Sequence, residues 1–250
     1  MVRAQAVALV LVCAGCAPEP EVCDLGSVVW LDSGAVFDTI DDAIAGLGGS
    51  GAIHLCAGRY RLGGSSLYGE GSGDTLRLLG AGASSTVLDG GGDSWVLMMI
   101  PPGSAYISDL SIVNGDAVPD CDEDGFGRCD DSFAGAGFAA WDSNVVLERV
   151  HISGHAATFG SALDVGNAAN VTIIDSLVER NYAEVAGAGA GLRLGGSTLT
   201  SQGTNWSDNN GGDIAFVEYA ERPEDVVVLG AFETEGRTDF TCTFDTLTCE

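Results

Sequence analysis

The chain has 250 residues, of which 46% are hydrophobic and 37 are glycine, and its formal net charge is −26. This length allows one large domain or two small ones. The acidic residues are spread among apolar segments, which favours a folded domain with an acidic surface over a disordered chain. All ten basic residues are arginines and none of them cluster, so nucleic acid is not expected as a partner.

The first residues have the pattern of an export signal. Arg3 precedes an apolar stretch that is too short to span a bilayer. The run Val-Cys-Ala-Gly-Cys that ends at Cys16 resembles a bacterial lipoprotein signal, in which the new terminal cysteine carries lipid. We therefore expect lipid on Cys16 and a location at the outer membrane or cell surface. Lipid on Cys13, or a plain secretory signal cleaved near Ala17 that leaves a secreted or periplasmic protein, are the alternatives.

The remaining cysteines also favour an oxidising compartment, because their number is even. They are Cys23, Cys56, Cys121, Cys129, Cys242 and Cys249. Proximity in the sequence suggests the pairs Cys121–Cys129 and Cys242–Cys249, which leaves Cys23 with Cys56. Zinc is the competing interpretation, but the mature chain has no Cys-x-x-Cys pair.

Three elements are predicted at the start of the domain. Residues 28–31 form a short strand, and the apolar spacing over 37–47 predicts a helix that Gly48 and Gly49 end. Apolar and polar side chains then alternate over 52–60, as in a half-buried strand.

This helix and the following Ile-x-Leu-x-Ala-Gly-x-Tyr segment (53–60) resemble the amino-terminal cap of right-handed parallel β-helix proteins of the pectin-lyase-like group. Later glycine-entry segments such as 160–163 and 211–214, with the turns 178–181 and 206–209, resemble polymorphic outer-membrane-protein repeats of bacterial surface proteins. The resemblance implies a fold and a surface location, and says little about activity.

A repeat in the second half of the chain points to the same architecture. If Ile112, Ile152, Val178 and Trp206 are equivalent, the spacings are 40, 26 and 28 residues. The first becomes 26 when about 14 residues around 119–133 are an insertion. A period of this length predicts stacked units that share one core. We expect an all-β, single-stranded right-handed parallel β-helix with a short N-terminal capping helix. An antiparallel sandwich is the alternative, but it needs hairpin turns that this sequence lacks.

The expected organisation is as follows. Residues 1–15 are the signal, 16–26 a tether and 27–250 the β-helix domain, with an inserted Asp-rich loop at about 117–133 and a C-terminal cap at about 218–250. Within that cap, 225–230 is expected to be the last strand, with Cys242 and Cys249 pinning a terminal loop.

The inserted loop has the spacing of a calcium loop, Asp-x-Asp-x-Asp-Gly with an acid at position twelve. The expected ligands are Asp120, Asp122, Asp124, the carbonyl of Phe126, and Asp131. No helices flank the loop, which resembles the calcium loops of extracellular modules such as thrombospondin type 3. The alternative is an acidic, disulfide-pinned loop without metal.

One group of residues is the candidate for catalysis. Its members are Glu148, Arg149, His151, Asp175 and Glu179. The fold resemblance implies this chemistry, because lyases on such a fold often use calcium with an arginine or lysine base, and hydrolases use paired carboxylates. The chain has no lysine, and acids on an outward strand face are commonly solvated surface, so we assign no catalytic residue. His54 and His155 are expected to be structural, and Trp206 to lie in the core.

The sequence therefore predicts an exported, lipid-anchored, monomeric bacterial surface protein with a structural, adhesive or glycan-binding role. A polysaccharide or another surface protein is the expected partner. The alternative is a carbohydrate-active enzyme, a lyase or hydrolase, acting on the outer face of the β-helix.

Overall fold

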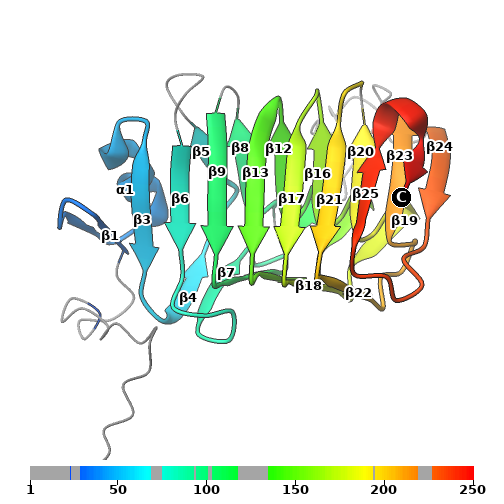
Figure 1. Ribbon diagram of the computed structural model, residues 1–250. Helices are drawn as coiled ribbons and strands as arrows, with labels where there is room; N and C mark the ends of the chain where they lie inside the picture. Colours follow the sequence, from blue (N-terminus) through cyan, green and yellow to red (C-terminus); the bar gives the residue numbers. More distant parts are fainter. Residues whose placement is uncertain are drawn as a thin grey trace, which may run out of the picture.

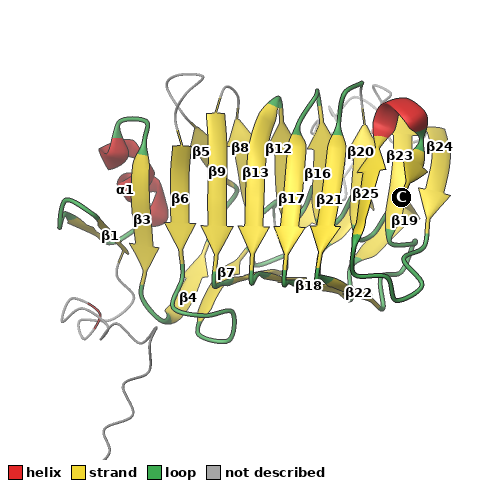
Figure 2. Ribbon diagram, in the orientation of Figure 1, coloured by secondary structure: helices red, strands yellow, loops and turns green. Residues whose placement is uncertain are grey.

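The computed structural model describes residue 23 and residues 29–68, 75–92, 94–100, 103–117, 135–193, 195–218 and 227–250. Strands dominate these residues, with one α-helix near the start and a 3₁₀ helix near the end (Figure 2). Each coil contributes one strand to each of several sheets, so the strands of successive coils lie side by side (Figure 1).

The longest sheet, called the long sheet below, has ten strands. Their order is β2 (Val36–Phe37), β1 (Val29–Leu31), β3 (Gly51–Leu55), β6 (Thr75–Leu79), β9 (Gly103–Ser108), β13 (Ser143–Glu148), β17 (Asn170–Ile174), β21 (Thr198–Gln202), β25 (Phe240–Thr243) and β26 (Thr248–Cys249). The strands from β3 to β21 are parallel, and the strands at both ends join antiparallel.

Three further sheets complete the coils. A six-stranded parallel sheet contains β4 (Gly58–Arg61), β7 (Thr86–Asp89), β10 (Ser111–Val113), β14 (His151–Ser153), β18 (Leu177–Glu179) and β22 (Asn205–Ser207). A seven-stranded sheet contains β5 (Ser65–Tyr68), β8 (Leu97–Ile100), β12 (Phe138–Trp141), β16 (Leu163–Gly166), β20 (Ala190–Arg193), β23 (Ile214–Glu218) and β24 (Val227–Phe232). A small sheet contains β11 (Asp116–Ala117), β15 (Ala156–Phe159) and β19 (Tyr182–Ala186).

The predicted stacking is confirmed residue by residue. Ile112 pairs with Ile152, Ile152 with Val178, and Val178 with Trp206, all between parallel strands. All four side chains are buried. Full burial of each aliphatic side chain contributes about 1.5–3 kcal/mol, and each coil obtains that burial only from its neighbours. The fold is therefore the expected right-handed parallel β-helix.

The N-terminal end is closed by helix α1 (Ile40–Leu47). The Thr39 hydroxyl caps it by accepting from the Asp42 amide at 3.1 Å, and Gly48 ends it in the left-handed conformation. Its inward side chains include Ile40 and Ile44. The helix starts later than the predicted residue 37, because that residue already belongs to β2.

Residues 52–60 are not one strand, and that prediction was wrong. β3 ends at Leu55 and β4 begins at Gly58, with a corner between them where the chain passes from the long sheet to the six-stranded sheet. The corner is fixed by the Tyr60 hydroxyl, which donates to the Cys56 carbonyl at 2.9 Å. Leu55 and Cys56 are both buried and Ala57 is exposed, so the alternation of buried side chains breaks at this corner. A disulfide joins Cys23 to Cys56.

The C-terminal end is closed by strands that reverse direction. β24 pairs antiparallel with β23, and the chain then returns to the long sheet as β25 and β26, with the 3₁₀ helix η3 (Phe244–Thr246) between them. The prediction that 225–230 is the last strand was therefore wrong, because β25 and β26 follow β24. Reversed strands satisfy the backbone groups that an open stack would expose. A disulfide joins the directly paired Cys242 and Cys249. None of the described helices has the length and apolar character needed to cross a bilayer.

Candidate functional site

The outer face of the long sheet presents rows of like side chains. Alternate residues of its strands are buried, among them Ala105, Val145, Val171 and Leu199, so their neighbours point outward. In-register pairing then aligns the outward residues of successive coils. One row contains Ser104, Asn144, Asn170, Thr198, Thr243 and Thr248, and a second contains Arg77, Tyr106, Val146, Thr172, Thr200 and Thr241.

Hydrogen bonds between strands hold the polar members of these rows. The Asn170 amide donates to the Asn144 amide oxygen at 3.2 Å, and the Thr198 hydroxyl donates to the Asn170 amide oxygen at 2.6 Å. In the second row the hydroxyls of Thr200 and Thr241 lie 3.3 Å apart. The side chains are therefore oriented before any ligand arrives.

Aromatic rings lie towards the N-terminal end of this face. Trp30 and His54 stack with ring centroids 4.9 Å apart, and His54 Nε2 lies 2.6 Å from an Asp32 carboxylate oxygen. The Arg77 guanidinium lies 5.7 Å from the centre of the Tyr106 ring. These rings provide stacking surfaces beside the polar rows.

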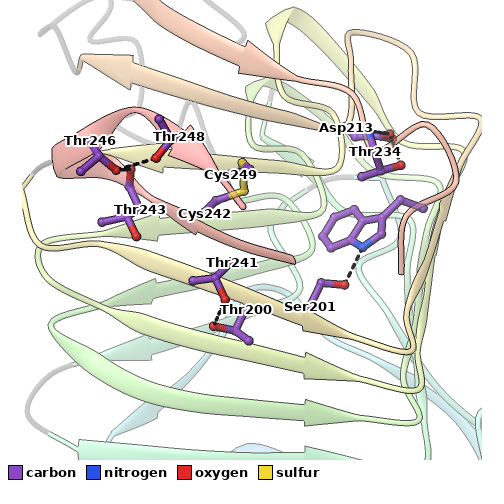
Figure 3. The surroundings of a disulfide bond; sticks show 11 residues. Thr200, Ser201, Asp213, Thr234, Thr241, Cys242, Thr243, Thr246, Thr248 and Cys249 are labelled. Atoms are coloured by element: carbon purple, nitrogen blue, oxygen red, sulfur yellow. Dashed lines mark hydrogen bonds between the residues drawn. A yellow bond between two sulfur atoms is a disulfide. The ribbon is translucent and has the colours of Figure 1, made fainter. Parts of the chain in front are cut away.

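The C-terminal cap continues the face instead of ending it (Figure 3). Thr243 pairs with Thr198, and Thr241 pairs with Thr200, so β25 adds one residue to each row. Thr248 on β26 pairs with Thr243 and adds another. The Cys242–Cys249 disulfide lies on the opposite side of these strands and joins them.

Glu148 and Arg149 lie at the rim of the face, where the chain turns from the long sheet into the six-stranded sheet. Arg149 occupies a left-handed corner (φ 53°). Its guanidinium donates to both carboxylate oxygens of Asp109, at 2.7 and 2.8 Å, and it also forms an ion pair with Glu148. The Tyr106 hydroxyl donates to the other Glu148 oxygen.

These bonds make Arg149 unsuitable as a general base. Its bonds to Asp109 raise the pKa of Arg149 even further above its usual range, and hold the pKa of Asp109 below its own. The hydrogen bond to Glu148 raises the pKa of Tyr106. A general base needs a pKa near the working pH, so Arg149 is held as an ion-pair partner of Asp109 and Glu148.

The other catalytic candidates are not bonded to that cluster, although Asp175 occupies the corner one coil on from Arg149. His151 and Glu179 project from the six-stranded sheet, where His151 Nε2 lies 3.2 Å from a Glu179 oxygen that also pairs with Arg180. Asp175 occupies a further left-handed corner (φ 47°). Within the described part of the chain, no hydrogen bond or ion pair joins Asp175, or the His151 pair, to Glu148 or Arg149.

His155 is structural, at a corner where the next two coils carry Asn181 and Asn209. Its Nδ1 accepts from the Gly115 amide at 2.9 Å, and its Nε2 lies 3.0 Å from the Ile112 carbonyl, so it is a neutral imidazole that donates there. Asn181 makes the matching pair of contacts one coil on, accepting from the His155 amide and donating to the Ile152 carbonyl. Burial lowers the pKa of His155 to about 4.

A buried ion pair lies on the seven-stranded sheet and was not predicted from the sequence. Asp164 is fully buried and accepts two hydrogen bonds from Arg193, at 2.8 and 2.7 Å, and one from the Trp141 ring at 2.7 Å. The Arg193 guanidinium also lies 4.9 Å from the centre of the Trp141 ring. The three residues come from adjacent coils, so the cluster ties β12, β16 and β20 together. Nothing in the local sequence marks it, because the partners are about one repeat apart.

A polar hollow of about 470 Å³ lies at the corner that follows the six-stranded sheet. Its walls include Arg61, Asp89, Asn114, Asp116 and several glycines. Partial burial raises the pKa of Asp89, but hydrogen bonds, the strongest from Arg59, outweigh it and leave this pKa below its usual range. The hollow is thus lined by groups that already bond to the protein.

The calcium, lipid and third-disulfide predictions fall outside the described residues. These are Asp120, Asp122, Asp124, Phe126 and Asp131, then Cys16, and then Cys121 and Cys129. Among the residues that are described, no group of three or more His, Cys, Asp or Glu side chains is arranged to hold a metal ion.

The fold and face define a parallel β-helix protein with a polar and aromatic outer surface. No family model matches the chain, and no curated protein does so either. Two solved structures match, a pectin methylesterase mutant in complex with hexasaccharide IV (TM-score 0.37) and a pectin methylesterase in complex with hexasaccharide VII (TM-score 0.34). Each is 14% identical, over 75% of this chain and 64% of the other. This chain therefore spans less than two thirds of those structures, and the likeness is one of fold.

Proposed function

We propose that the protein is a glycan-binding surface protein that binds its ligand through the outer face of the long sheet and does not catalyse a reaction of that ligand. The observation that carries this proposal is the set of cross-strand hydrogen bonds that orients uncharged polar groups in rows, next to half-buried aromatic rings. Amides and hydroxyls match the hydroxyls of sugars, and aromatic rings match the apolar faces of sugar rings.

Export and lipid anchoring are part of the proposal. The signal-like segment before Cys16 supports them, as do the two disulfides of the described residues, Cys23–Cys56 and Cys242–Cys249. A monomer held at the outer membrane by lipid would present the face to glycans outside. Mass spectrometry of the protein from membranes tests this: acylated Cys16 supports the anchor, and a free thiol there contradicts it.

Catalysis at the rim is the second candidate, because Tyr106, Glu148, Arg149 and Asp109 form one hydrogen-bonded chain beside the face. The pairing of Arg149 with two carboxylates argues against it. Incubation with pectin, alginate and chondroitin plus calcium, followed by product absorbance and reducing ends, separates the two functions. Turnover that Glu148→Gln or Arg149→Ala abolishes would overturn the non-enzymatic proposal.

Binding is tested on a panel of soluble and insoluble glycans, acidic and neutral. Tyr106→Ala removes a ring from the face and is expected to weaken binding about tenfold, in the range of an interface tyrosine. Tyr182→Ala is the matched control, since Tyr182 is 46% exposed on β19, away from the long sheet. Equal binding by both variants, or no glycan binding at all, contradicts the proposal.

A further inference from the structure

The middle and C-terminal part of the outer face is almost free of charge. The central face is defined here as the outward side chains of β9, β13, β17, β21, β25 and β26. They are Ser104, Tyr106, Asn144, Val146, Glu148, Asn170, Thr172, Ile174, Thr198, Thr200, Gln202, Thr241, Thr243 and Thr248. Within these strands Glu148 is the one charged member, and its carboxylate is bonded to Tyr106 and Arg149. The charge of Glu250 lies at the outer edge of the face, where this residue follows β26 and exchanges backbone hydrogen bonds with Thr241.

The neighbouring sheet shows how unusual this is. The outward side chains of the six-stranded sheet include Arg59, Arg61, Asp89 and Glu179. The chain as a whole carries a net charge of −26. An uncharged face on such a protein is suited to an uncharged ligand, because neither steering nor ion pairing is available there.

The face repeats in two directions. Along each strand, outward residues recur every two positions, about 6.6–6.8 Å, and across strands they recur every 4.7–4.9 Å. Three pairs of side chains, Asn144–Asn170, Asn170–Thr198 and Thr200–Thr241, are bonded across strands and therefore follow this repeat. A single polymer chain repeats in one direction only, whereas an ordered layer of chains repeats in two.

The face is also continuous. No described segment crosses in front of β6, β9, β13, β17 or β21 in Figure 1, and the cap adds β25 and β26 in the same sheet. The polar hollow lies elsewhere, at the corner after the six-stranded sheet. A broad ligand surface can therefore lie across many strands at once.

We infer that the ligand of the central face is an insoluble, ordered and uncharged polysaccharide, bound by its flat surface and not as a single dissolved chain. This inference rests on the proposed glycan-binding function and narrows it to one class of ligand.

Sedimentation with microcrystalline cellulose and with α-chitin powder tests the inference. Acid-swollen amorphous forms of the same polymers, and soluble cellohexaose and chitohexaose, are the comparison ligands. We expect the partition constant per accessible area to be at least tenfold higher on one of the crystalline forms than on its amorphous form. Both hexasaccharides should bind at least tenfold more weakly.

Charge on the face should abolish this preference. Thr200→Glu and Thr172→Glu place a carboxylate at half-buried outward positions and are each expected to lower partition at least tenfold. Ser207→Glu is the matched control, because Ser207 is a half-buried outward residue of β22 on the six-stranded sheet. Circular dichroism confirms that each variant is folded. If one of the two threonine variants does not fold, the other still tests the inference.

The outcomes separate the two claims. Equal binding of soluble and crystalline forms through the same face overturns this inference and leaves the proposed function standing. Binding only to acidic glycans also overturns this inference and leaves the proposed function standing. Failure to bind any glycan overturns both, and a Ser207→Glu defect as large as that of Thr200→Glu assigns the binding to another surface and overturns the inference.

Discussion

His155 makes the stability of the fold depend on pH in a defined window. The imidazole is buried, and both of its nitrogens are engaged as in the neutral form, so a proton on Nδ1 would replace the hydrogen bond from Gly115 with two opposed donors. Burial lowers its pKa from the ordinary 6.5 to about 4, although the bond to the Ile112 carbonyl opposes this in part.

Lowering the pH through this window destabilises the folded state. Between pH 6.5 and 4 the unfolded chain binds a proton at residue 155 and the folded chain does not, so the free energy of unfolding falls as the pH falls. One pKa unit corresponds to 1.36 kcal/mol, so a shift of this size removes about 3 kcal/mol by pH 4. Asp89 and Asp109, whose pKa values are lowered, stabilise the fold above the pKa of an unfolded Asp, about 3.9, and lose that stabilisation mainly as the pH falls below about 4.

His155→Asn isolates this term, because asparagine makes the same two contacts at residue 181 in the next coil. Urea unfolding followed by tryptophan fluorescence at pH 7, 5.5 and 4 gives the free energies. The variant should lose about 3 kcal/mol less than the wild type between pH 7 and 4. His151→Asn, at a half-exposed histidine, is the control and should keep most of the wild-type dependence. Equal losses in wild type and His155→Asn would refute the reasoning.

The buried ion pair, one tightly packed glycine and the Asp-rich loop can each be tested by substitution or chelation. Asp164→Ala leaves the Arg193 guanidinium buried without its carboxylate and should cost about 3–5 kcal/mol of unfolding free energy by urea titration; a cost under 1 kcal/mol would show that the pair is not structural. Gly115→Ala places a Cβ against the Ala136 backbone carbonyl of the same coil and should cost about 1–3 kcal/mol, whereas Gly63→Ala, with nothing within 4 Å, should change stability little. Removal of calcium by chelator should lower the melting temperature of the wild type but not of Asp122→Asn, and an unchanged wild-type value would mean that the loop is acidic without metal.

The coil stacking was predictable because inward residues recur at a nearly fixed spacing. Ile152, Val178 and Trp206 could be aligned from the sequence, and the pairing of their strands confirms the alignment. Corners were harder to predict, because the one at Cys56 separates β3 from β4 by only two residues and leaves little mark on the sequence pattern.

The site was predictable only in part. Glu148 and Arg149 were identified as neighbours, but the partner that fixes Arg149, Asp109, is 40 residues away and meets it only through stacking. The rows of the outer face did have a signal, namely Asn144, Asn170 and Thr198 at equivalent outward positions. That signal becomes meaningful once the register is known, since a one-residue slip would turn these side chains inward.

Successive coils must stack in register to form the outer face and its rows, and to place His155 next to Asn181. Methyl NOE spectra of the isotope-labelled protein measure this directly. The account predicts strong contacts between the methyl groups of Ile112 and Ile152, and between those of Ile152 and Val178, across parallel strands. Absence of both contacts, with NOEs instead that place these strands antiparallel or shifted by one residue, would contradict it.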